Sequence, residues 1–233
     1  MRLTPQVLTD APIVINPEKK AVLSLRDLKI PYVENLGITR DSYEVIDFTG
    51  NELIELTNFP KLKKLHTLLA GRNSITYIDS ESFAKCVPYL NSLVLVQNNI
   101  SKFREMSSLS CLSKLENLSL MRNPIASDPN YRLFVIWLIP SLRILDFWKI
   151  KQKERERAKE LFGESMDTAS SFAKDLLGES YAVDSSNHSN GGLVEASVQR
   201  LSAEERSALL EKLEKTSDLE EIELIERTLR NVS

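Results

Sequence analysis

One asparagine and four apolar residues recur in a fixed pattern along the first 150 residues. In the clearest copy, Leu90–Ile100, apolar residues lie eight, five and three positions before Asn98 and two positions after it. The same pattern surrounds Asn51, Asn73 and Asn123, and two further copies, at Leu28 and Ile150, have the asparagine replaced and keep three of the four apolar residues. The intervals between successive copies are 23, 22, 25, 25 and 27 residues. A chain built in this way must place one similar structural unit after another.

The intervals fall within the range of about 20–29 residues that is typical of leucine-rich repeats. The residues five and three positions before the asparagine alternate as in a strand, so both side chains face the core. A buried asparagine at the following bend donates and accepts hydrogen bonds that satisfy backbone groups there. The pattern predicts a structural ladder of Asn51, Asn73, Asn98 and Asn123.

The predicted fold class is therefore α/β, a leucine-rich repeat solenoid with a parallel sheet on its concave face. We expect short helices or 3₁₀ turns on the convex side, around the apolar residues Leu56, Phe59, Leu62, Ile78, Phe83, Met106, Leu109 and Leu112. A cap follows at residues 131–150, with a helix that ends before Pro140 and a strand from Ile144 to Phe147. The alternative is an ordinary α/β domain with coincidental leucine spacing.

Five segments follow from the composition along the chain. Residues 1–20 are a lead-in that caps the first repeat, residues 21–150 are the repeat domain with its cap, and residues 151–162 are a charged helix. Residues 163–198 are rich in Ser, Gly and Asn and predict a flexible linker. Residues 199–233 predict two amphipathic helices, which are either a docking element for another protein or a hairpin folded on itself.

The side chains that alternate with the core residues should point out of the concave sheet. They include Asp47, Thr49, Leu69, Val94, Val96, Met121 and Trp148, with Arg72, Gln97 and Arg122 at the edge. An apolar strip with a charged rim indicates a protein-binding groove, and its width suits an amphipathic helix of a partner. The other interpretation is that the C-terminal segment of this chain covers the strip.

The charge distribution limits nucleic-acid binding to local clusters. Residues 1–150 hold 18 Lys and Arg against 15 Asp and Glu, and residues 151–233 hold 12 against 18, so the chain is not generally basic. The candidates for contact with an RNA backbone are Lys19, Lys20, Arg26, Lys149, Lys151 and Lys153. A solvated surface is an equally good interpretation of each cluster.

Motifs of catalysis and metal binding are missing from the sequence. It lacks nucleotide-binding glycine motifs, hydrolase motifs and clusters of Cys, His and carboxylates at ligand spacing, so we expect a binding protein without cofactor, rather than an enzyme. Cys86 and Cys111 are expected to be small buried thiols. Neither a signal peptide nor an apolar run of about 18 residues is present, which predicts a reducing compartment, cytosol or nucleus, and no membrane partner.

Specific stretches carry a family resemblance. They are Leu25–Gly37, Ile46–Leu53, Leu65–Ile75, Arg122–Ile125, Tyr131–Ile136 and Arg143–Arg155. Together they resemble the U2 small nuclear ribonucleoprotein A-prime family over residues 20–162, and Ser217–Leu229 is similar to the C-terminal helical segment of that family. Residues 163–198 show no such similarity.

The resemblance implies a pre-mRNA splicing factor of the nucleus, a structural subunit of the U2 particle. It implies that the concave face holds a helix of an RRM protein called B-double-prime, and that the pair holds a stem-loop of the U2 snRNA. The C-terminal helices would dock on other spliceosomal proteins. The alternative is a leucine-rich repeat adaptor that regulates a nuclear phosphatase or another enzyme without RNA.

Overall fold

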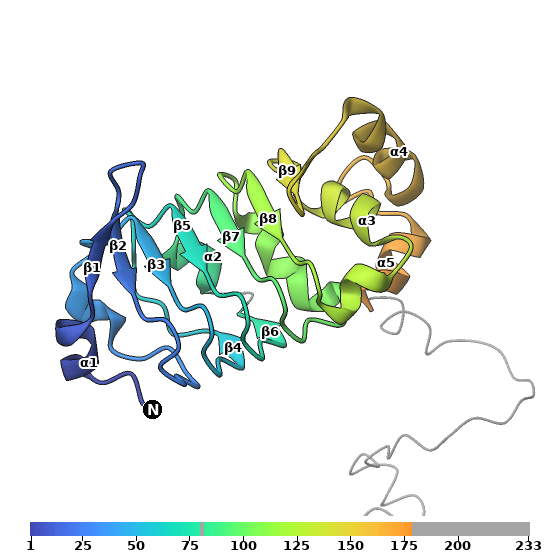
Figure 1. Cartoon of the computed structure of the whole chain (residues 1–233). Coiled ribbons are helices and arrows are strands. Elements are labelled where there is room, and N and C mark those ends of the chain that lie inside the picture. The colour runs from blue at the N-terminus through green and yellow to red at the C-terminus, as the bar shows by residue number, and fades with distance from the viewer. Residues whose placement is uncertain (80–81, 179–233) are drawn as a thin grey trace, which may run out of the picture. The chain divides into compact units, whose positions relative to one another are not determined.

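The computed structural model describes residues 1–79 and 82–178 (Figure 1). The main sheet has eight strands in the order β1-β2-β3-β5-β7-β8-β9-β10. Their bounds are β1 Ile13–Ile15, β2 Ala21–Ser24, β3 Val45–Asp47, β5 Thr67–Leu69, β7 Ser92–Val94, β8 Asn117–Ser119, β9 Ile144–Leu145 and β10 Trp148–Lys149. The strands from β2 to β9 are parallel, which confirms the predicted solenoid with a parallel concave sheet. The predicted helices of residues 199–233 lie outside the described residues.

Short elements lie on the convex side and at the two ends of the solenoid (Figure 1). A second sheet pairs β4 (Glu55–Leu56) with β6 (Tyr77–Ile78), and the helices are α1 Pro5–Asp10, α2 Phe83–Cys86, α3 Tyr131–Leu138, α4 Gln152–Phe162 and α5 Ser171–Leu177. Three 3₁₀ helices are η1 Leu36–Thr39, η2 Phe103–Cys111 and η3 Pro124–Ser127. The expectation of helical turns is therefore correct around Phe83 and Met106, but Leu56 and Ile78 lie in strands. None of the helices within the described ranges is long and apolar enough to cross a membrane.

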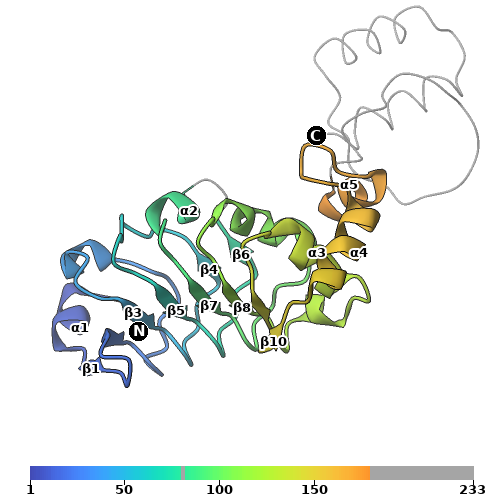
Figure 2. The same ribbon diagram turned by 90° about the horizontal axis from the view of Figure 1, so that it is seen from above.

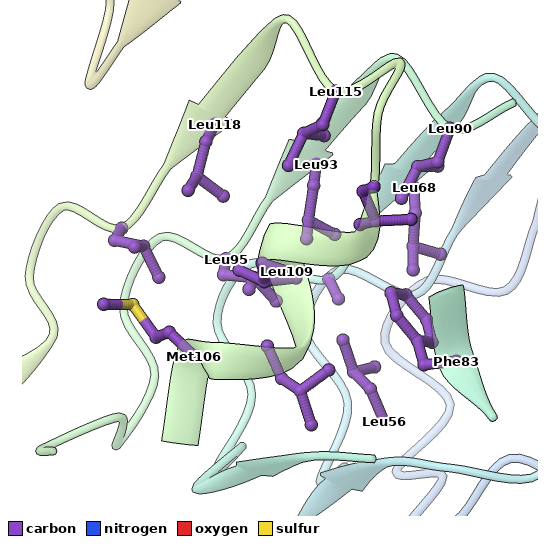
Figure 3. Close-up of a cluster of buried hydrophobic side chains, with 14 of the residues drawn as sticks. Leu56, Leu68, Phe83, Leu90, Leu93, Leu95, Met106, Leu109, Leu115 and Leu118 are labelled. Atoms are coloured by element: carbon purple, nitrogen blue, oxygen red, sulfur yellow. The ribbon is translucent and has the colours of Figure 1, made fainter. Parts of the chain in front are cut away.

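The register of the sheet stacks equivalent residues of successive repeats. Each residue five positions before a repeat's bend lies beside its counterpart in the next strand, in the series Leu23, Ile46, Leu68, Leu93, Leu118 and Leu145. All six are buried. Figure 3 shows Leu68, Leu93 and Leu118 pointing into one core with Phe83, Met106 and Leu109 from the convex side. The repeats therefore share a continuous apolar core, which a single repeat does not have.

Each ladder asparagine joins its own repeat to the preceding one. Asn98 donates from Nδ2 to the carbonyls of Leu95, at 3.0 Å, and Ala70, at 2.9 Å, while its Oδ1 accepts from the Ile75 amide at 2.9 Å. Asn51, Asn73 and Asn123 make the same kinds of bonds in their own repeats. All four side chains are buried, so these bonds satisfy backbone groups that water does not reach.

The N-terminal segment is more ordered than a simple lead-in. Thr4 caps α1, and Leu3 and Leu8 are buried against the first repeat. Strand β1 then pairs antiparallel with β2, which gives the sheet an edge that the repeat pattern alone does not predict. Ile13–Ile15 followed by Asn16 and Pro17 was the available sequence signal, because a β-branched run ending in turn residues is typical of a hairpin.

The C-terminal cap differs from the prediction at its last strand. Strand β9 ends at Leu145, and Asp146 and Phe147, with φ of 52° and 65°, form a two-residue turn into β10. Trp148 therefore lies opposite Leu145 in an antiparallel pair, and opposite residues share a face. The predicted place of Trp148 on the concave face is wrong, because the chain reverses after Leu145.

Two further expectations fail at the surface. The flexible linker predicted for residues 163–198 is not what the described part of that range forms, because helix α5 lies at Ser171–Leu177 and buries Ala173 and Leu177. Residues 179–198 lie outside the described residues. The Phe172 ring stacks on Phe162 with centroids 5.7 Å apart. Cys111 is exposed and Cys86 is half-buried, so the expectation of two buried thiols is also wrong.

Candidate partner-binding face

The middle of the concave face carries an apolar strip. Leu69 on β5 lies beside Val94 on β7, and both side chains are half-buried. Val96 and Met121 extend the strip beyond the ends of β7 and β8, and Met121 is 41% exposed. We call Leu69, Val94, Val96 and Met121 the concave strip. Its members come from three neighbouring strands, which span roughly 10 Å.

Polar side chains border the strip where the strands end. Arg72, Gln97 and Arg122 each directly precede a ladder asparagine, and all three are exposed. Their φ angles are 56°, 58° and 60°, a left-handed conformation that is unfavourable for residues with a Cβ. The amide of Arg72 donates to the Val96 carbonyl and that of Gln97 to the Met121 carbonyl, both at 2.8 Å. The same backbone bend therefore sets the position of each rim side chain.

The predicted groove residues nearer the N-terminus have other partners. Asp47 is only 5% exposed, and its carboxylate accepts from the Arg26 guanidinium at 3.2 Å and from the Thr49 amide at 2.9 Å. Thr49 itself is half-buried. The carboxylate of Asp47 thus organises this end of the face rather than extending the strip.

A hollow of about 560 Å³ lies beside the strip, at the starts of the strands. Its lining includes Leu69 and the β1–β2 turn residues Asn16, Glu18 and Lys20. Within that turn, Asn16 Oδ1 accepts from the Lys20 amide at 2.9 Å, and Lys20 Nζ pairs with Glu18 at 2.7 Å. The sequence pattern does not predict that the β1–β2 turn lines this hollow, because residues 1–20 lie outside the repeats and carry no repeat signal.

The six candidate RNA contacts form two separate groups. Lys19 and Lys20 belong to the β1–β2 turn and Arg26 follows β2, whereas Lys149 lies on β10, Lys151 directly precedes α4 and Lys153 lies in its first turn. Five sheet spacings separate β2 from β9, which is about 24 Å. The candidates are therefore not one patch, and the two groups lie at opposite ends of the sheet.

The charges near the C-terminal group are partly balanced. Arg132 on α3 donates from Nε to Glu154 Oε1 on α4 at 2.7 Å, and from its second terminal nitrogen to Oε2 at 3.3 Å. The hydrogen bond from Arg132 holds the pKa of Glu154 below its usual range. In the part of the chain that the structure describes, three or more His, Cys, Asp or Glu side chains nowhere cluster so that they could hold a metal ion.

Comparisons with known proteins agree with this architecture. A family model described as leucine-rich repeat matches residues 1–176. The U2 small nuclear ribonucleoprotein A′ of Debaryomyces hansenii is 50% identical over 235 residues, which covers 99% of both chains. The Candida albicans protein of the same name is 44% identical over 231 residues, covering 99% of this chain and 98% of that protein. A chain of the Drosophila melanogaster SNF/U2A′ complex superposes with a TM-score of 0.70 at 40% identity, covering 77% of this chain and 99% of that chain.

Proposed function

The chain belongs to the U2 small nuclear ribonucleoprotein A′ family, and we propose that it is a splicing subunit of the U2 particle that holds a partner helix on its concave strip. The partner that we infer is the RRM protein B-double-prime. The proposal is based mainly on the concave strip, in which the apolar side chains Leu69, Val94, Val96 and Met121 remain accessible on the concave face of the sheet. The Drosophila relative was crystallised as an SNF/U2A′ complex, which supports a protein partner.

The dimensions and charges of the strip favour a helix. Three neighbouring strands span roughly 10 Å, which is about the diameter of an α-helix with its side chains. An amphipathic helix would lay its apolar face on Leu69, Val94 and Val96. Arg72 and Arg122 at the rim would then meet acidic side chains or the C-terminal end of that helix, where the helix dipole is negative.

The RNA part of the proposal rests on the two basic groups. One contains Lys19, Lys20 and Arg26, and the other contains Lys149, Lys151 and Lys153, so cations lie beyond both ends of the strip. A partner bound between them would place its RNA near one of these groups, and lysines there would contact phosphates without reading the sequence. We infer that the RNA is the U2 stem-loop and that the complex works in the nucleus. Docking of the C-terminal helices on other spliceosomal proteins remains a prediction for residues outside the described ones.

The experiment reverses the charge of the rim. The double substitution Arg72→Glu and Arg122→Glu should weaken binding of the purified RRM partner about tenfold or more. The new carboxylates would repel the negative groups of the partner that the arginines attract. The matched control is Lys85→Glu with Arg104→Glu, since both side chains are exposed on convex elements. Titration calorimetry gives the affinities, and melting curves check that both variants fold. Equal affinities for the two variants would place the partner elsewhere.

A further inference from the structure

A second exposed surface lies at the turn between β9 and β10, at the opposite end of the sheet from α1 (Figure 2). Phe147 and Trp148 are 73% and 74% exposed, more than any other large apolar side chain in residues 1–79 and 82–178. Trp148 shares the face of Leu145 and not that of the concave strip. The proposed partner groove therefore leaves these two aromatic rings unexplained.

The backbone holds the two rings in place at a cost. Asp146 and Phe147 both have positive φ, and although aspartate is accepted at the first position of such a turn, Phe147 stands where glycine is favoured. The conformation is fixed by the Asp146 carboxylate, whose Oδ1 accepts from the Leu120 amide at 2.7 Å and whose Oδ2 accepts from the Tyr131 hydroxyl at 2.8 Å. A strained turn that its neighbours hold rigid is typical of a functional position.

Basic side chains lie beside Trp148. A hollow of about 410 Å³ beside the turn is lined by Trp148, Lys149, Lys151, Arg132 and Glu154. The Glu154 carboxylate is already occupied, because it accepts from Arg132 at 2.7 Å and from the Lys151 amide at 2.8 Å. Within the described part of the chain, Lys149, Lys151 and the nearby Lys153 form no ion pair. The turn therefore combines two exposed aromatic rings with lysines that form no ion pair among the described residues.

We propose that Phe147, Trp148, Lys149 and Lys151, which we call the turn patch, bind unpaired nucleotides of RNA. The rings stack on bases, and the lysines contact the phosphates on either side, as in sites for single-stranded nucleic acid. A protein partner fits less well, because the cores of protein interfaces are depleted of lysine. A duplex also fits less well, since its base faces are already stacked. The inference adds a ligand class to the RNA contact of the proposed function and does not involve the concave strip.

The test uses the full chain without its protein partner. The probe is a fluorescein-labelled uridine decamer, compared with an abasic decamer of the same charge and with a duplex of the same length. Phe147→Ala with Trp148→Ala should weaken binding of the uridine decamer about tenfold or more and leave binding of the abasic strand nearly unchanged. The matched control is Tyr77→Ala with Tyr89→Ala, two exposed aromatics of other repeats, which should change neither. Lys149→Gln with Lys151→Gln should weaken binding of both strands.

Intrinsic fluorescence gives an independent reading. The chain has two tryptophans, and Trp137 is 6% exposed and donates its ring N–H to the Gly163 carbonyl at 2.8 Å. Quenching by the unlabelled decamer therefore reports on Trp148, and Trp148→Phe should remove the quenching while it keeps most of the affinity.

Three outcomes overturn the inference. They are equal losses for the uridine and abasic strands, tighter binding of the duplex, and a decamer affinity that is unchanged in the double alanine variant. Because the rim variants are tested with the RRM partner, either proposal can fail while the other stands.

Discussion

The hydroxyl of Tyr131 at the start of α3 donates a hydrogen bond of 2.8 Å to Asp146, the first residue of the β9–β10 turn. Tyr131 is buried, and this burial, together with the Asp146 carboxylate, raises the pKa of its hydroxyl far above the ordinary value. The second oxygen of Asp146 accepts from the Leu120 amide, so one carboxylate ties together the last repeat, the capping helix and the β9–β10 turn.

Tyr131→Phe should therefore destabilise the fold by about 1 kcal/mol, the usual value of one hydrogen bond, as measured by urea denaturation at pH 7. Because the pKa of the folded state lies above that of the unfolded chain, the stabilisation by Tyr131 is complete below about pH 10 and is lost at higher pH. The difference between the native protein and this variant should shrink above that pH. Tyr89→Phe, at an exposed position, is the control and should behave as the native protein does. A constant difference up to pH 11 would contradict the assignment.

Asn98→Ala should destabilise the repeat domain by about 2–4 kcal/mol, because it removes three buried hydrogen bonds and leaves the buried Ile75 amide without a partner. The Ala70 and Leu95 carbonyls each keep one bond, from Asn73 and Asn123. Asn99→Ala is the matched control, since that side chain is exposed, and surface changes of this kind are usually within about 0.5 kcal/mol. Thermal melting of the two variants makes the comparison. Equal melting temperatures would mean that the ladder does not stabilise the repeats.

Gln97→Gly should stabilise the fold by about 1 kcal/mol, because glycine adopts the observed φ of 58° without the penalty of a Cβ. Gln97→Ala keeps the Cβ and should show no such gain. Both substitutions remove the same rim side chain, so both should weaken binding of the partner equally. The urea midpoints and the affinities are measured on the same preparations. A gain in stability for alanine would show that the left-handed backbone is not the cause.

Glu154→Gln should lower stability at pH 7 by no more than about 1 kcal/mol, since the pair with Arg132 is partly exposed. The pKa of Glu154 is lowered in the folded state, so its contribution is present above the unfolded value of about 4.3 and is lost as the pH falls through the folded pKa. The variant and the native protein should therefore converge in acid. Glu160→Gln, at an exposed position of α4, is the control. A difference that persists at pH 2 would rule out the ion pair as its source.

The central repeats could be predicted because their signals are local and repeated. Alternation along each strand indicates which side chain faces the core, and equal register from repeat to repeat places Leu69 beside Val94. The positions of Val96 and Met121 follow from the same alternation. The fold and the concave strip can therefore be predicted from one kind of long-range contact, the stacking of equivalent residues in successive repeats.

The two ends of the sheet depend on contacts that the repeat pattern does not contain. Phe147 stands where a two-residue turn favours glycine, so the sequence predicts a strand through to Phe147 and places Trp148 on the wrong face. Strand β1 pairs antiparallel with β2, and this pairing places the β1–β2 turn so that it lines the hollow beside the concave strip. The sequence does not predict helix α5, because its apolar pattern is short and the residues around it are rich in Ser, Gly and Asn.

Affinity purification of the tagged protein from nuclear extract, with and without RNase, tests whether the concave strip holds an RRM protein of the U2 particle. The variant with Arg72→Glu and Arg122→Glu is purified in parallel. We expect the native protein to recover U2 RNA and an RRM protein, the RRM protein to remain after RNase, and the variant to lose it. Recovery of a phosphatase or another enzyme without RNA would contradict the proposed function. Loss of the RRM protein after RNase treatment would contradict direct binding of that protein by the concave strip.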